Sequence, residues 1–167
     1  MTHSEVIILR LLTTRDLYGY QIDQLIEENK MRYWADIGFS SIYNVLNKLE
    51  DRALVSSYFV KEPGSPKRKV YRISEQGSTE LRGEVKRMLS SPSAHRDDFA
   101  VALVSSDVLS EAEFQQSLAE YRAYLQRKLQ FFREELPQRT IQKQRVAMAI
   151  ERFARIIAAE IQWLDER

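Results

Sequence analysis

Residues 39–55 read FSSIYNVLNKLEDRALV, and the rest of the chain can be interpreted outward from them. Apolar side chains recur three or four residues apart, at Ile42, Val45, Leu46 and Leu49. That spacing lines one face of an α-helix with apolar groups and predicts that this face is buried. Ser40 stands just before the run, where its hydroxyl can accept the free N–H groups of the first turn. The stretch therefore predicts a capped helix that buries one side.

The opposite side of this helix carries hydrogen-bonding groups and a single cation. Its members, with Ser40 at the start, are Ser41, Tyr43, Asn44, Asn47 and Lys48. Asparagine amides can pair with adenine edges, and a lysine can reach guanine or a phosphate. We predict that these side chains contact the major groove of DNA. An ordinary solvated helix face would have the same composition, so the following segment decides between the two interpretations.

A change of periodicity follows the helix. Residues 54–60 and 70–73 are rich in β-forming side chains, and Pro-Gly-Ser-Pro lies between them, which predicts a β-hairpin with an extended tip. Its cations are Lys61, Lys67, Arg68, Lys69 and Arg72, against the single carboxylate of Glu62. A basic hairpin directly after a helix pair favours a wing that holds the DNA backbone over a merely solvated loop. Lys67, Arg68 and Lys69 are the predicted backbone contacts.

Two helices are predicted before this unit. Residues 4–12 are apolar nearly all round, which indicates burial on several sides, one of them against a partner subunit. Asp16 is expected to cap a second helix with Tyr18 in its first turn. The Tyr18 hydroxyl could reach a phosphate, or the residue could be a core tyrosine with a wet tip. Gly19 leaves room for another helix to approach closely.

The second half of the chain is predicted to be helical. Ser74 should cap a helix that runs to about residue 89. The Ser-Pro-rich residues 90–93 then mark a domain boundary. The chain is predicted to have a DNA-binding domain, residues 1–89, and a helical domain, residues 90–167. A short helix should follow from Asp97 or Asp98. Ser110 and Glu113 match a capping box that opens a long helix, which Pro137 should end.

The last helix, predicted for about residues 139–165, has two apolar flanks. The first consists of Val146, Ile150, Phe153, Ile157, Ile161 and Leu164, and the second of Met148, Ala149, Ile156 and Trp163. An antiparallel helix pair buries only one stripe, so we predict that the second flank meets another chain. The predicted dimer interface consists of Phe153, Ile157, Ile161, Trp163 and Leu164.

The composition narrows the function classes. The 167 residues contain no cysteine and only two histidines, His3 and His95, so no disulfide, thiol chemistry, metal site or cofactor is predicted. The sequence offers no nucleophile–histidine–acid set and no phosphate-binding glycine loop, which disfavours an enzyme. It also shows no signal-peptide pattern and no apolar run near the ~18 residues of a membrane span, so a cytoplasmic, nucleoid-associated protein is expected.

With these residues in place, the chain resembles the PadR family of transcriptional regulators. The shared motifs are Leu17–Ile22, Ser41–Tyr43 followed by Leu46, Leu49 and Glu50, Leu54–Val55, Arg68–Tyr71 and Ile73–Gly77. Two positions depart from the family pattern. Asn44 stands where proline is common and adds a donor and an acceptor to the DNA-facing side. Ala53 replaces a usual glycine, which suggests that the turn there needs no left-handed residue.

The resemblance implies a mostly α fold: a winged helix-turn-helix domain with a two-stranded β-wing, followed by an α-helical dimerisation domain. It implies a homodimer, formed by the C-terminal helices with the first helix. We expect a repressor that binds a pseudo-palindromic operator, with half-sites about one turn (~34 Å) apart. Release by a small aromatic effector is a further hypothesis, although most of the aromatic residues of the second half are better explained as dimer core. The alternative from another class is a winged-helix protein–protein adaptor with a helical docking stalk.

Overall fold

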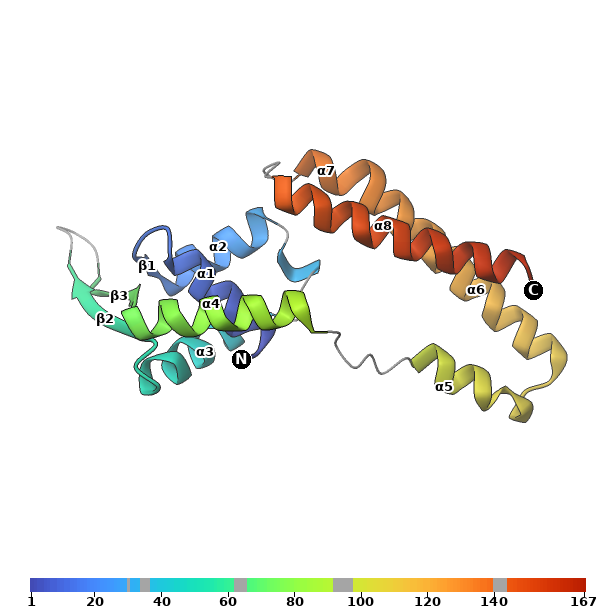
Figure 1. The fold of residues 1–167 in the computed structure, drawn as a ribbon, viewed down its shortest axis with the longest axis horizontal. Coiled ribbons are helices and arrows are strands. Elements are labelled where there is room, and N and C mark those ends of the chain that lie inside the picture. The colour runs from blue at the N-terminus through green and yellow to red at the C-terminus, as the bar shows by residue number, and fades with distance from the viewer. Residues whose placement is uncertain (30, 34–36, 62–65, 92–97, 140–143) are drawn as a thin grey trace. The chain divides into compact units, whose positions relative to one another are not determined.

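The computed structural model describes residues 1–29, 31–33, 37–61, 66–91, 98–139 and 144–167 (Figure 1). The chain forms two compact units, Met1–Ser93 and Ala94–Arg167, and each is described separately below. The predicted mostly α fold with a small antiparallel sheet is confirmed. None of the helices in the described ranges is both long and apolar enough to cross a membrane.

The first unit is a helical cluster with a sheet at its edge. Its helices are α1 (His3–Leu12), α2 (Gly19–Glu28), a 3-10 turn (Met31–Tyr33), α3 (Phe39–Asp51) and α4 (Glu75–Ser90). The predicted burial of α1 on several sides is visible within the unit, because Ile8, Leu9, Leu11 and Leu12 are all buried. The apolar stripe of α3 packs into the same core, where Ile42, Leu46 and Leu49 are fully buried.

The sheet has three antiparallel strands, in the order β1-β3-β2. The hairpin strands are β2 (Val55–Val60) and β3 (Arg68–Ile73), and β1 (Leu17–Tyr18) pairs with β3 on its other side. The sequence did not predict β1, since two residues carry no readable periodicity. Because Tyr18 belongs to this strand, it lies just before α2 and not in its first turn, and Asp16 does not cap that helix. Residues 62–65, in the predicted hairpin tip, lie outside the described residues.

Both ends of α3 differ from the prediction. Gly38 is the N-cap, so Ser40 already lies inside the helix, and its side chain falls outside the described part of the structure. At the other end Ala53 has φ 57°, in the left-handed region that L side chains disfavour. The inference that this turn needs no left-handed residue is therefore wrong. The turn must reverse the chain so that the Leu54 N–H reaches the Leu49 carbonyl oxygen, at 2.9 Å.

Ala53→Gly is expected to raise the free energy of unfolding by about 0.5–1 kcal/mol. Glycine adopts this φ without a Cβ clash, and that gain exceeds the entropy it adds to the unfolded chain. Urea titration followed by circular dichroism measures the change. Ala53→Val is the opposing control and should lower stability, because a branched side chain fits the left-handed region worse than alanine. An Ala53→Gly protein less stable than wild type would contradict the idea that the left-handed backbone of Ala53 is strained.

The second unit is a set of helices in which α6 and α8 form the main pair. Its elements are α5 (Asp98–Val104), a 3-10 turn (Ser106–Val108), α6 (Glu111–Gln130), a π-helical segment (Phe131–Glu135), α7 (Leu136–Arg139) and α8 (Gln144–Asp165). The capping box of Ser110 and Glu113 is confirmed. Leu125, Phe132, Leu136, Ile150 and Ile157 are among the buried residues of this unit.

Pro137 does not end the long helix, contrary to the prediction. The helix widens before it, where the Leu136 N–H bonds to the carbonyl oxygen of Phe131, five residues earlier. Such a widened turn tolerates a residue that has no N–H to donate. Helical structure therefore continues through Arg139, which belongs to α7 and not to the last helix. Residues 140–143 lie outside the described residues.

Candidate nucleic-acid interface

The solvent-facing side of α3 presents four of the residues predicted to contact DNA. Tyr43, Asn44, Asn47 and Lys48 are all exposed and form two adjacent pairs about one helical turn apart, so they make one continuous strip. Ser41 is only partly exposed, and its hydroxyl donates to the Gly38 carbonyl oxygen at the start of the helix. The strip consists of amide, hydroxyl and ammonium groups above a buried apolar stripe.

Helix α2 approaches α3 closely at Gly19, as the sequence predicted. A Cβ at this position would lie 2.6 Å from Cε1 of Tyr43, which is closer than carbon atoms can pack. The missing side chain therefore provides the space that the Tyr43 ring occupies. This contact connects the N-terminus of α2 to the exposed strip of α3.

Arg68 of the wing rests against Tyr18. Its guanidinium carbon lies 5.1 Å from the centre of the Tyr18 ring, and its Nη1 donates to the Tyr18 hydroxyl at 3.4 Å. Lys67 lies 4.4 Å above the ring of Phe59, which is 58% exposed. Lys69 Nζ lies 5.1 Å from the centre of the Tyr71 ring, so aromatic rings support all three cations predicted to hold DNA.

A groove of about 470 Å³ joins the wing to the helix pair. It is lined by Tyr18, Gly19, Tyr20, Tyr43, Arg68, Lys69 and Tyr71. Four of the residues predicted from the sequence meet there, while Tyr20 was not predicted although it belongs to the same motif. The groove combines phenol groups, basic side chains and the N-terminal end of α2, which carries a partial positive charge. Such a combination suits an anionic phosphate.

Two of the five wing cations are paired with carboxylates, which the sequence analysis did not anticipate. Lys69 Nζ lies 2.6 Å from Glu50, and Arg72 lies 2.7 Å from Asp16. Hydrogen bonds from Lys69 and then Ser57 lower the pKa of Glu50, and the hydrogen bond from Arg72 lowers the pKa of Asp16. Both carboxylates are therefore ionised at neutral pH and compensate the charges of their partners.

Comparison with known proteins identifies the family. The family model described as "Transcriptional regulator PadR-like family" matches residues 8–83, which hold the whole of this helix and wing arrangement. The chain belongs to the PadR-like family. An uncharacterised protein from Lysinibacillus sphaericus is 36% identical over 84 residues, which cover 50% of this chain and 76% of that protein. The prediction made from the sequence motifs is confirmed.

Solved PadR-like structures share the fold over nearly the full chain. The complex of Bacillus subtilis PadR with operator DNA has a TM-score of 0.74 at 21% identity and covers 97% of this chain and 95% of that one. The Vibrio cholerae virulence activator AphA has a TM-score of 0.70 at 26% identity, and the match covers 98% of this chain and 94% of that one. B. subtilis PadR has also been solved with p-coumaric acid, with a TM-score of 0.72 at 20% identity over 97% of this chain and 91% of that one. The chain therefore has the winged-helix fold of these structures, and the family to which it belongs is one of transcriptional regulators.

The residues predicted for the dimer interface lie along α8. Phe153 stacks on Phe132 of the same unit at 5.5 Å, and Ile157 is buried within that unit. Trp163 lies edge-on to Phe99 at 6.2 Å. Ile161 and Leu164 are partly exposed. Much of the predicted interface stripe thus packs against the chain's own helices, while Met148 and Ile156, from the second flank, are 62% and 46% exposed.

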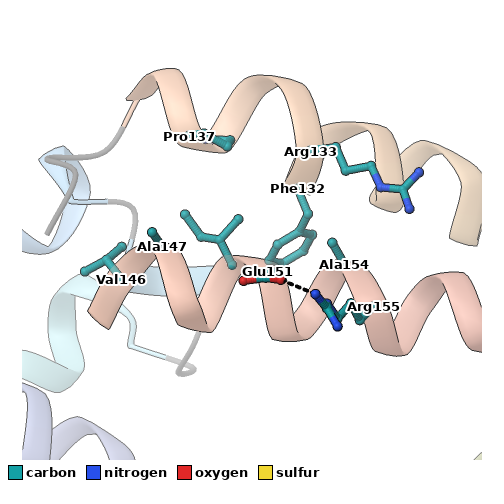
Figure 2. A pocket seen from close by; sticks show the side chains of 9 residues that line it. Phe132, Arg133, Pro137, Val146, Ala147, Glu151, Ala154 and Arg155 are labelled. Carbon is teal, nitrogen blue, oxygen red and sulfur yellow. Dashed lines mark hydrogen bonds and ion pairs between the residues drawn. The ribbon is translucent and has the colours of Figure 1, made fainter. Parts of the chain in front are cut away.

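A second groove of about 470 Å³ lies between the end of the long helical segment and α8 (Figure 2). Its apolar lining includes Phe132, Pro137 and Ile150, and Figure 2 shows Phe132 and Pro137 directed from one helix toward the other. Glu151 and Arg155 form an ion pair at its edge. The groove therefore offers aromatic and aliphatic surface with charged groups nearby.

Proposed function

We propose that the protein is a homodimeric repressor that binds a pseudo-palindromic operator in duplex DNA. The observation that carries this proposal is the convergence of Tyr18, Tyr43 and Arg68 on one groove beside the exposed amides of α3. The operator complex of B. subtilis PadR supports it by analogy, because the two proteins share their fold. Such a protein would act in the cytoplasm, where chromosomal DNA lies.

In this proposal α3 and the wing contact different parts of the DNA. Helix α3 enters the major groove, where Asn44 and Asn47 read base edges and Lys48 reaches guanine or a phosphate. Ser40 and Ser41 lie at the N-terminal end of the same helix. Tyr18, Lys67 and Arg68 hold the backbone beside it, which fixes the register of the helix without reading sequence. Two copies would reach successive major grooves about one turn (~34 Å) apart.

The dimer is proposed to form through the second unit. Met148 and Ile156 expose apolar surface on α8 and extend the predicted interface of Phe153, Ile157, Ile161, Trp163 and Leu164. Exposed apolar surface of this kind is typical of a contact with another chain. Light scattering at micromolar concentration tests this, and a monomer would remove the two-fold operator from the proposal.

Lys48→Ala and Arg68→Ala should each reduce the slope of log affinity against log salt by about 1. Each lysine or arginine that touches a phosphate releases about one counterion on binding. Fluorescence anisotropy over a salt series measures the slope, with DNA from upstream of the protein's own gene as the first probe. Arg82→Ala, on an exposed face of α4, is the matched control and should leave the slope unchanged.

An unchanged slope in either variant would remove that residue from the phosphate contacts. If the wild-type protein binds this duplex no more tightly than competitor DNA at physiological salt, the adaptor interpretation replaces the regulator described above. Nuclease protection of the same fragment gives the site length, its symmetry and the half-site spacing. A reporter fusion then separates repression from activation.

The proposed effector is a small aromatic molecule that binds the second unit and shifts the protein between DNA-binding and released states. The p-coumaric acid complex of B. subtilis PadR supports this class of ligand. The groove in Figure 2 has a volume in the range of small-molecule sites. Titration with phenolic acids should change the tryptophan fluorescence and weaken operator binding. A flat response across the series would contradict the proposal and leave the aromatic residues as dimer core.

A further inference from the structure

We propose that Glu50 and Lys69 form a positioning pair, in which Lys69 does not contact DNA but neutralises Glu50 and fixes the wing against α3. The pair would set the distance between the base-reading amides of α3 and the backbone contact of Arg68. This inference rests on the proposed function, because it assigns roles within the same DNA-binding surface. It also replaces the role that the sequence predicted for Lys69.

The pair joins three elements of the first unit. Glu50 lies in the last turn of α3 and accepts hydrogen bonds from Lys69 Nζ at 2.6 Å, on β3, and from the Ser57 hydroxyl at 2.5 Å, on β2. Ser57 lies opposite Tyr71 and Lys69 lies opposite Phe59, so both donors extend from the same face of the hairpin. One carboxylate therefore holds both strands of the wing to the helix.

The position of Glu50 makes its charge relevant to DNA. It follows Tyr43 by seven residues and Asn47 by three, so it lies on the flank of α3 that borders the groove. An uncompensated carboxylate there would repel the phosphates that the groove is proposed to hold. The Lys69 ammonium group removes this repulsion. Both side chains remain about one-third exposed, close enough to solvent for phosphates to sense their charge.

Arg68, the neighbouring residue, has a different environment. Successive residues of a strand point to opposite faces, so Arg68 extends toward Tyr18 while Lys69 extends toward Glu50. Within the described ranges no carboxylate pairs with Arg68 or Lys67. Of the three cations predicted to hold DNA, Lys67 and Arg68 thus remain available for phosphate, while Lys69 is paired with α3.

Asp16 and Arg72 provide a matched comparison on the same strand. Arg72 donates to Asp16 at 2.7 Å, and Asp16 also accepts from the Tyr58 hydroxyl at 2.8 Å. This pair is built like the first one, with a cation of β3 and a hydroxyl of β2 meeting one carboxylate. Neither Asp16 nor Arg72 lines the groove beside Tyr43. Asp16 instead lines a separate groove with Tyr18 and Arg68, and it keeps the hydrogen bond from Tyr58 when Arg72 is replaced. The loss of Arg72 should therefore affect binding less than the loss of Lys69.

The test compares Lys69→Gln, Glu50→Gln and the double variant, with Arg72→Gln as the control. Each is titrated in a salt series with the duplex that the wild-type protein protects, and thermal unfolding of each variant verifies that it is folded. Lys69→Gln should weaken binding at least tenfold at low salt, and this loss should shrink as added salt screens the repulsion from Glu50. The double variant should recover to within about threefold of wild type. Glu50→Gln can accept from Lys69 through its Oε1 and donate to the Ser57 hydroxyl oxygen through its Nε2. This variant and Arg72→Gln should each stay within about threefold.

Two outcomes would overturn the inference. A Lys69→Gln slope reduced by about 1, without recovery in the double variant, would make Lys69 a phosphate contact. Unchanged affinity in Lys69→Gln would remove any role in binding. If Lys69→Gln does not fold, Glu50→Ala supplies the comparison. This variant removes the carboxylate and both of its hydrogen bonds, so it should free the wing from α3 and weaken DNA binding. Unchanged affinity of Glu50→Ala for DNA would again overturn the inference. Failure of the wild-type protein to protect any DNA would instead contradict the proposed function itself.

Discussion

Leu46→Ala should lower the free energy of unfolding by about 2–5 kcal/mol, because it leaves a cavity under the DNA-facing helix. Leu46 has no exposed surface and packs in the core of the first unit with Ile42 and Leu49. The removed atoms lose their contacts with neighbours from other elements, which can close the gap only in part. Urea titration followed by circular dichroism measures the loss.

The adjacent Asn47→Ala is the matched control. Asn47 is exposed on the opposite side of α3, so its stability should stay within about 0.5 kcal/mol of wild type. If Asn47 reads a base, the Asn47→Ala protein should discriminate between the operator and altered sites by about 1–3 kcal/mol less than the wild type. The two variants separate folding from recognition on neighbouring residues. A stable Leu46→Ala protein that lost DNA binding would mean that the helix faces the opposite way.

Gly77→Ala should lower the free energy of unfolding by about 3 kcal/mol or more, at the upper end for overpacking. A Cβ on Gly77 would lie 2.0 Å from the Leu54 carbonyl oxygen, and a backbone atom cannot move aside as a side chain can. The same oxygen accepts the Ser74 N–H at 3.0 Å, so displacing it would also disturb the start of α4. Thermal and urea unfolding both report the effect.

Gly83→Ala provides the control in the same helix. No heavy atom lies within 4 Å of the position that its Cβ would take. An alanine there should stabilise the helix by about 0.5–1 kcal/mol, since glycine is a poor helix former. Opposite signs for the two substitutions would show that packing and not helix propensity governs Gly77. A Gly77→Ala protein as stable as wild type would contradict the close contact.

Local patterns predicted most of the secondary structure. The apolar stripe of α3, the Ser74 cap of α4 and the capping box of Ser110 and Glu113 all depend on groups within a few residues of one another. The basic hairpin was likewise readable, because its turn residues and its β-forming runs are adjacent in the chain. These features yielded the family and the residues expected to face DNA.

The errors share a different physical origin. Strand β1 exists because Leu17 and Tyr18 pair with Tyr71 and Val70, which lie far along the chain. The left-handed Ala53 and the helix that continues past Pro137 are backbone conformations that the surrounding structure imposes on residues that disfavour them. Neither residue type indicates its conformation by itself.

The sequence by itself determined which faces of the helices are apolar, where α4 and α6 begin and which segment is basic. Only the tertiary structure decided which of the basic side chains remain available for DNA. Glu50 is 19 residues from Lys69, and Asp16 is 56 residues from Arg72, yet both pairs are in direct contact. Net charge is a property of composition, but the charge that a phosphate meets depends on which ions the fold has already brought together.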